Sequence, residues 1–136
     1  MQVVRTERAP VASESDIVNT RQLVRKCSIE AGFSLVDQTK IVTAASELAR
    51  NTVQYGGGGS LVVELLDDAG RRGIRLTFAD QGPGIADIDQ AMRDGFTTGS
   101  GLGLGLSGSR RLMNEFSITS EVGRGTTVVV IRWKLK

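Results

Sequence analysis

The chain has 136 residues, of which 40% are hydrophobic and 24% are charged, and its formal net charge is +2. This length and composition exclude disordered and fibrous classes, and we expect residues 1–136 to form a single globular domain with its own core. The small charge, carried by scattered basic pairs, argues against nucleic acid as a partner.

Histidine is absent, which excludes Ser-His-Asp and Cys-His catalytic groups, imidazole metal sites and a phosphorylated histidine. A general base must therefore be a carboxylate, a lysine or a tyrosine. The single cysteine, Cys27, has apolar neighbours at helical spacing, which predicts a buried structural thiol. We find neither a secretory signal nor a run of about 18 apolar residues, and we expect a cytoplasmic protein that does not enter a membrane.

The predicted elements follow the order βααββααββ. A short strand at 3–8 precedes two helices, 13–31 and 34–55, and each helix begins with the capping pattern Ser-x-x-Asp. Strands at 60–67 and 73–80, a short helix around 85–95 and a helix over 104–115 come next. A hairpin of strands at 116–121 and 126–135 ends the chain. This order predicts an α+β two-layer sandwich, with helices packed on one face of a mixed, mostly antiparallel sheet.

The first candidate site is "SELARNTVQY" in the second helix. Glu47 and Asn51 are one helical turn apart and project from one face, while Ile41, Ala45 and Leu48 turn toward the core. The pair suits a general base beside a metal-binding amide. A solvated polar face would show the same pattern.

The second candidate site is "RLTFADQGPGI". Counting by twos places Asp80 on the apolar face of its strand with Phe78, where a carboxylate is costly unless a donor meets it. Gly82 and Gly84 follow, and their missing side chains would let a flat ligand approach the backbone. A tight turn in which Asp80 accepts from the next amides is the alternative, and the alternation favours the ligand.

The third candidate site is "TTGSGLGLGLSGSRR", residues 97–111, whose alternating glycines free the backbone to bend around an anion at a helix N-terminus. It contains the dinucleotide pattern G-x-G-x-x-G at Gly103, Gly105 and Gly108, and Glu121 lies near the spacing of a ribose-binding acid. However, no buried strand precedes the glycines, and the chain has no Gly-Lys dipeptide, so the sequence favours neither a Rossmann fold nor a P-loop.

These sites, together with Gly123-x-Gly125-Thr126 in the last hairpin, resemble in their order the N, G1, G2 and G3 boxes of the GHKL (Bergerat-fold) ATP-binding family. The resemblance covers nearly the whole chain. It implies that Asp80 accepts a hydrogen bond from the adenine amino group, with Gly82, Gly84 and Thr126 in the base pocket. It implies further roles for the remaining residues: Asn51 for Mg²⁺, Gly101, Gly103 and Gly105 for the phosphates of ATP, and Glu47 for the acceptor hydroxyl.

Within this family, "SELARN", "DQGPGI" and "RLMNEFS" look most like the RsbT-like switch kinases. That resemblance implies a serine/threonine kinase that phosphorylates STAS-domain stressosome proteins (RsbS- or RsbR-like) and, once released, activates a PP2C-type phosphatase (RsbU-like). The alternatives are an anti-sigma factor kinase of the RsbW/SpoIIAB type and a dinucleotide oxidoreductase. The anti-sigma type typically carries an arginine just before the loop glycines, and none lies between Phe96 and Ser109. The candidate cations for phosphoryl transfer are therefore Arg50 and Arg110.

Overall fold

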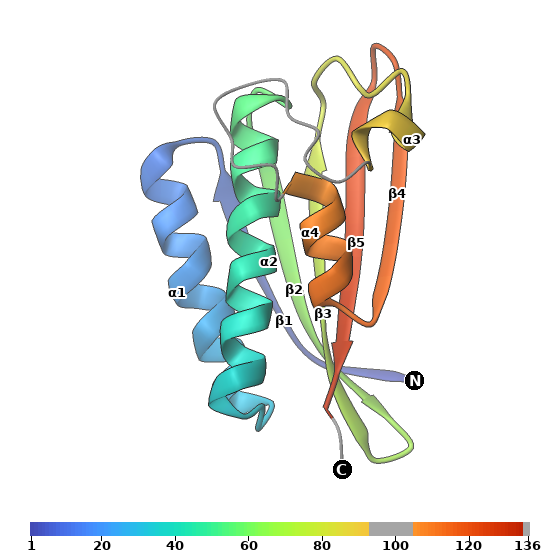
Figure 1. The fold of residues 1–136 in the computed structure, drawn as a ribbon. Coiled ribbons are helices and arrows are strands. Elements are labelled where there is room, and N and C mark those ends of the chain that lie inside the picture. The colour runs from blue at the N-terminus through green and yellow to red at the C-terminus, as the bar shows by residue number, and fades with distance from the viewer. Residues whose placement is uncertain (93–104, 135–136) are drawn as a thin grey trace.

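The computed structural model describes residues 1–92 and 105–134. Its elements are β1 (Gln2–Val11), α1 (Glu14–Glu30), α2 (Leu35–Gln54), β2 (Gly59–Asp68), β3 (Arg71–Asp80), α3 (Ile88–Ala91), α4 (Gly105–Leu112), β4 (Glu115–Glu121) and β5 (Gly125–Trp133). This is the predicted order, and Figure 1 shows α1, α2 and α4 in front of the strands.

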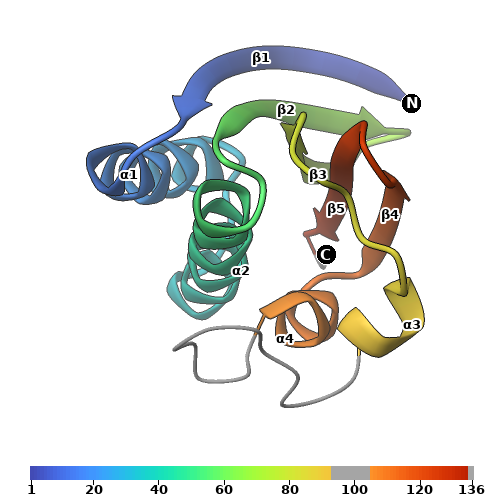
Figure 2. The same ribbon diagram turned by 90° about the horizontal axis from the view of Figure 1, so that it is seen from above.

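The five strands form one sheet in the order β1-β2-β3-β5-β4. Each neighbouring pair of strands is antiparallel. The described sheet is therefore entirely antiparallel, whereas the sequence predicted a mixed, mostly antiparallel sheet. Viewed from above, the sheet curves around α1, α2 and α4, which all lie on its concave face (Figure 2). The predicted two-layer α+β sandwich is confirmed.

The helices α1 and α2 begin at the predicted capping patterns. The Ser13 hydroxyl accepts a hydrogen bond from the Asp16 amide at 3.2 Å, and the Ser34 hydroxyl accepts one from the Asp37 amide, also at 3.2 Å. Each cap satisfies an amide that would otherwise lack a partner, which contributes about 1 kcal/mol. None of the helices in the described ranges is long and apolar enough to cross a membrane.

The helix α4 ends at Leu112, before the predicted end near residue 115. The Asn114 amide donates to the Ile131 carbonyl at 2.9 Å, and the Asn114 side-chain oxygen accepts from the Trp133 amide at 2.7 Å. These bonds draw the chain into the sheet, so β4 begins at Glu115 where the sequence predicted helix.

The hydrophobic core lies between α2 and the concave face of the sheet. Ile41, Ala45 and Leu48 of α2 are at most 1% exposed, as their spacing predicted. The sheet contributes Leu61, Val63, Ile74, Leu76 and Phe78 to the same core. Since burying one large aliphatic side chain stabilises a protein by about 1.5–3 kcal/mol, this layer fixes the direction in which the polar side of α2 points.

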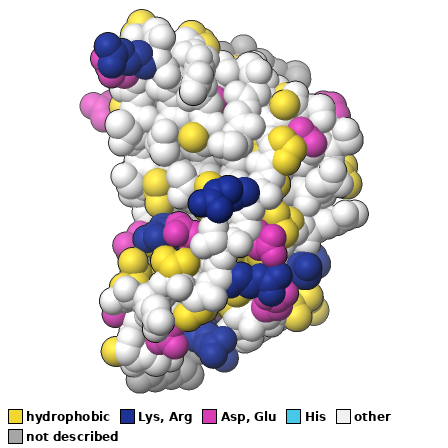
Figure 3. Space-filling model, turned by 180° about the vertical axis from the view of Figure 1, so that it is seen from behind, with side chains coloured by type: hydrophobic (Ala, Val, Ile, Leu, Met, Phe, Trp, Pro, Cys, Tyr) yellow, Lys and Arg dark blue, Asp and Glu magenta, His cyan; other side chains and the backbone are white. Residues whose placement is uncertain are grey.

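Within residues 1–92 and 105–134, no helix covers the convex face of the sheet (Figure 2). Figure 3 shows this face, on which Lys and Arg side chains alternate with Asp and Glu side chains. Glu64 and Arg75 are cross-strand partners there, with Arg75 Nε donating to Glu64 Oε1 at 2.8 Å. This hydrogen bond lowers the pKa of the Glu64 carboxyl group.

Cys27 is a buried thiol, as the sequence predicted. It is 1% exposed, and burial raises the pKa of its thiol. A thiol in this setting stays protonated at neutral pH and packs as a small apolar group, so it is not a nucleophile.

Arg132 connects three elements, and its removal should destabilise the fold. From β5, it donates to Asp37 Oδ1 in α2 at 2.9 Å and to the Leu112 carbonyl in α4 at 2.7 Å, and its side chain is 14% exposed. Because Arg132→Ala leaves a partly buried carboxylate unpaired, we expect a loss of about 2–4 kcal/mol in the free energy of unfolding, measured by urea titration.

Arg124→Ala is the control for this prediction. The Arg124 side chain is 78% exposed and lies 3.6 Å from Glu121, so its removal should cost less than about 0.5 kcal/mol. Equal losses for the two variants would show that Arg132 does not connect the elements in the way its contacts indicate.

Candidate functional site

Glu47 and Asn51 lie side by side on α2. They are one turn apart, so both side chains leave the same side of the helix. The Glu47 side chain is 19% exposed, and its Oε1 accepts a hydrogen bond from Arg50 Nη1 at 3.1 Å. Arg50, one of the two candidate cations, is thus paired with Glu47. A carboxylate held in this way can take a proton from a hydroxyl group that approaches the outer side of α2.

Asp80 ends β3 on the face that the sequence predicted. Phe78, two residues earlier, is 2% exposed, and Asp80 is partly buried. Asp80 Oδ1 accepts hydrogen bonds from the Gly82 amide at 2.9 Å and from the Thr126 amide at 3.2 Å. The turn alternative is therefore correct for Oδ1. In the described part of the chain no hydrogen bond reaches Oδ2, so this oxygen can accept one from a ligand.

Gly56, which sequence reasoning missed, lies against the Asp80 carboxylate. A Cβ atom on Gly56 would collide with Oδ2 of Asp80. The Gly56 amide also donates to the carbonyl of Asn51 at 3.3 Å. The end of α2 and the end of β3 therefore meet at Gly56, which brings Asn51 and Asp80 to the same end of the molecule (Figure 1). The glycine run after Tyr55 is the signal that could have identified Gly56.

Gly82 and Gly84 lie where other backbone segments come close. A Cβ atom on Gly82 would be 2.6 Å from the Gly56 carbonyl oxygen. Gly84 has a φ of +77°, and a Cβ atom there would collide with the Glu121 carbonyl. Both glycines thus let the turn after β3 pack against its neighbours. Their assignment to the close approach of a flat ligand stays a prediction.

Thr126 reaches Asp80 from the hairpin of β4 and β5. Thr126 and Ser120 are cross-strand partners, and their hydroxyl oxygens are 2.8 Å apart. The Ser120 hydroxyl also accepts from the Ile85 amide at 2.7 Å, which joins the hairpin to the turn after Asp80. Sequence reasoning included Thr126 but missed Ser120.

The glycine-rich segment is only partly described. Gly101 and Gly103 lie outside the described residues, and Gly105 is the first residue of α4. The helix α3 precedes this segment, so the described ranges contain no strand there that could begin a Rossmann βαβ unit. The other candidate cation, Arg110, is exposed in the last turn of α4.

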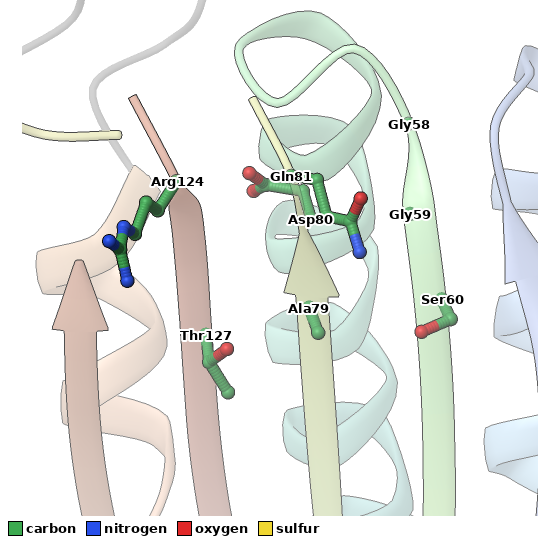
Figure 4. Close-up of a pocket in the computed structure, with 8 residues that line it drawn as sticks. All are labelled: Gly58, Gly59, Ser60, Ala79, Asp80, Gln81, Arg124 and Thr127. Carbon is green, nitrogen blue, oxygen red and sulfur yellow. The ribbon is translucent and has the colours of Figure 1, made fainter. Parts of the chain in front are cut away.

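A hollow of about 510 Å³ opens beside Asp80, at the ends of β2, β3 and β5 (Figure 4). Ser60 and Ala79 line it, and both alternate along their strands with buried core residues. They therefore lie on the convex face of the sheet. Because Asn51 belongs to a helix on the concave face, the hollow and the predicted site share Asp80 and little else.

The polar groups around Asp80 fit an adenine nucleotide. Adenine presents an exocyclic amine that needs an acceptor, and Asp80 Oδ2 is an acceptor whose position is fixed by the two hydrogen bonds to Oδ1. Asn51 supplies an amide oxygen at the same end of the molecule. One or two oxygen ligands of this kind are sufficient for a magnesium ion that is mainly bound by phosphates.

Comparison with known sequences identifies the family of the chain. Residues 36–136 match the family described as histidine kinase-, DNA gyrase B-, and HSP90-like ATPase. The chain is 50% identical over 123 residues to the serine/threonine-protein kinase RsbT of Bacillus subtilis, which covers 90% of this chain and 92% of that protein. It is 35% identical over 97 residues to an anti-sigma F factor of Geobacillus thermodenitrificans, covering 66% of this chain and 65% of that protein.

Solved structures show the same fold. The RsbU and RsbW domains of a Mycobacterium tuberculosis protein superpose with a TM-score of 0.66 and 21% identity, over 95% of this chain and 32% of that larger chain. Together with the sequence matches, this shows that the chain belongs to the histidine kinase-, DNA gyrase B-, and HSP90-like ATPase family, in its branch of RsbT-type serine/threonine kinases.

Proposed function

We propose that this ATP-dependent serine/threonine kinase phosphorylates a STAS-domain protein of the stressosome, related to RsbS or RsbR. Once released, it would activate a PP2C-type phosphatase related to RsbU. The observation that carries the proposal is the position of Glu47, a carboxylate 19% exposed that lies one turn before Asn51 on α2, the helix whose C-terminal end meets Asp80 at Gly56. The cytoplasm, where ATP is available, is the proposed location.

Each residue has a separate task in this proposal. Asp80 binds the adenine amine, and Thr126 lies beside it as a second polar contact. Asn51 would hold Mg²⁺, which supplies charge neutralisation for the phosphates of ATP. Gly101, Gly103 and Gly105 would offer their backbone amides to those phosphates.

Glu47 would accept the proton of the serine or threonine hydroxyl as that oxygen attacks the terminal phosphorus of ATP. The γ-phosphoryl group moves to the hydroxyl oxygen, and ADP leaves. Arg50 holds Glu47 Oε1 at 3.1 Å, which leaves Oε2 for the acceptor. This division of the two oxygens orients the base before the partner protein arrives.

Transfer of labelled phosphate from ATP to a purified STAS protein tests the proposal. We expect a labelled serine or threonine with the unaltered kinase and, at an ATP concentration below saturation, much less label with Asp80→Asn, because that variant binds ATP more weakly. No transfer to any STAS protein, despite measured ATP binding, would show that the proposed substrate is wrong.

The anti-sigma alternative rests on the 35% identity to an anti-sigma F factor. A protein of that kind would sequester a sigma factor and phosphorylate its antagonist. Affinity capture from an extract of the source organism separates the two functions. Recovery of a STAS protein and a phosphatase supports the switch kinase, whereas recovery of a sigma factor supports the alternative.

A further inference from the structure

Ser120 occupies a position that the proposed kinase mechanism leaves without a role. It lies near the end of β4 on the same face as Phe116 and Ile118, which pack against the hydrophobic core. A hydroxyl group on such a face loses free energy unless it finds partners. Ser120 finds them in two other segments of the chain.

The hydroxyl of Ser120 connects the hairpin of β4 and β5 to the turn after β3 through hydrogen bonds. Its oxygen accepts from the Ile85 amide at 2.7 Å, lies 2.8 Å from the Thr126 hydroxyl, and is 3.2 Å from the Gly125 carbonyl. Thr126 in turn donates its amide to Asp80 at 3.2 Å. Asp80, Thr126 and Ser120 thus lie next to one another on the adjacent strands β3, β5 and β4.

We propose that Ser120 is a positioning residue for adenine recognition: its hydroxyl fixes Thr126 and the turn after Asp80, and so sets nucleotide affinity and base selectivity. The inference rests on the proposed adenine contact of Asp80. It assigns to Ser120 no contact with the nucleotide and no part in phosphoryl transfer.

The hydrogen-bond donors and acceptors around Ser120 explain why a hydroxyl group is needed at this position. Ser120 has one proton and can donate it to the Gly125 carbonyl, while it accepts from Ile85. The proton between Ser120 and Thr126 then belongs to Thr126. Consequently the hydroxyl oxygen of Thr126, whose backbone amide donates to Asp80, keeps its lone pairs as acceptors for a base amine or for a water molecule that bridges to it.

Nucleotide titrations of Ser120→Ala test this role. We expect the Kd of Mg-ATP to rise about tenfold, because the variant leaves the Ile85 amide unpaired and lets the turn move. The preference for ATP over GTP should fall, and kcat at saturating ATP should change less than about twofold. A residue with a purely structural role would change the thermal midpoint without changing this preference.

Two further variants make the test specific. Ser120→Thr keeps the hydroxyl on a residue that favours strands and should restore both affinity and selectivity. Ser117→Ala is the matched control, because Ser117 is an exposed serine of the same strand on the opposite face, and it should behave as the unaltered protein does.

The outcomes separate this inference from the proposed site. If Ser120→Ala binds ATP and rejects GTP as the unaltered protein does, or if Ser120→Thr is as defective as Ser120→Ala, then the hydroxyl has no positioning role. If Asp80→Asn also leaves ATP binding unchanged, the adenine site itself is wrong, and the inference fails with it.

Discussion

Asp80→Asn should weaken ATP binding by about 10- to 100-fold while the fold is retained, since a hydrogen bond to a charged acceptor contributes about 1.5–3 kcal/mol. The asparagine oxygen can keep the two bonds that Oδ1 makes to the Gly82 and Thr126 amides. The side-chain NH₂ group then replaces Oδ2 and presents a donor to the adenine amine, which is itself a donor. Isothermal titration with Mg-ATP measures the change, and urea unfolding checks the fold.

Asp89→Asn is a suitable control, because Asp89 is an exposed residue in the first turn of α3. It should bind ATP as the unaltered protein does. Normal ATP binding by Asp80→Asn, with the fold intact, would remove Asp80 from the base pocket and with it the main support for an ATP site at this end of the molecule.

Glu47→Ala should reduce the rate of phosphoryl transfer by about 10²- to 10⁴-fold, which is the usual contribution of a general base. The affinity for ATP should remain nearly constant, since Glu47 is assigned to the acceptor hydroxyl and not to the nucleotide. Single-turnover transfer of labelled phosphate measures the rate, and a separate titration measures the affinity. The loss should therefore appear in kcat.

Glu14→Ala controls for the loss of a carboxylate from a helix, because Glu14 is exposed in the first turn of α1. Its transfer rate should be unchanged. A Glu47→Ala variant that phosphorylates its partner at the normal rate would refute the assignment of Glu47 as the general base. Any role of Arg50 in phosphoryl transfer would then be independent of its hydrogen bond to Glu47.

The order of the elements could be predicted because the local signals agree with the fold. The Ser-x-x-Asp patterns at Ser13 and Ser34 mark where α1 and α2 begin, since a hydroxyl cap satisfies an amide within its own segment. The end of α4 could not be predicted in this way. It depends on contacts of Asn114 with Ile131 and Trp133, which are distant in sequence and adjacent only after β5 has joined the sheet.

The site was predictable to the extent that strand alternation reveals it. Counting by twos identified Asp80 as a polar residue on an apolar face, and the same count applied to Phe116 and Ile118 would have identified Ser120. The partners of these residues could not be predicted. The contact of Gly56 with Asp80 and the pairing of Arg50 with Glu47 depend on the tertiary path and on the choice of side-chain rotamer.

Among the strands of the described residues, β5 is synthesised last, yet it lies inside the sheet, between β3 and β4. It carries Thr126, whose amide completes the support of the Asp80 carboxylate. During synthesis on the ribosome, a chain that has not yet reached Gly125 therefore has Asp80 but lacks the strand that orients it. If Asp80 binds adenine as proposed, nucleotide binding should begin only after β5 has inserted between β3 and β4.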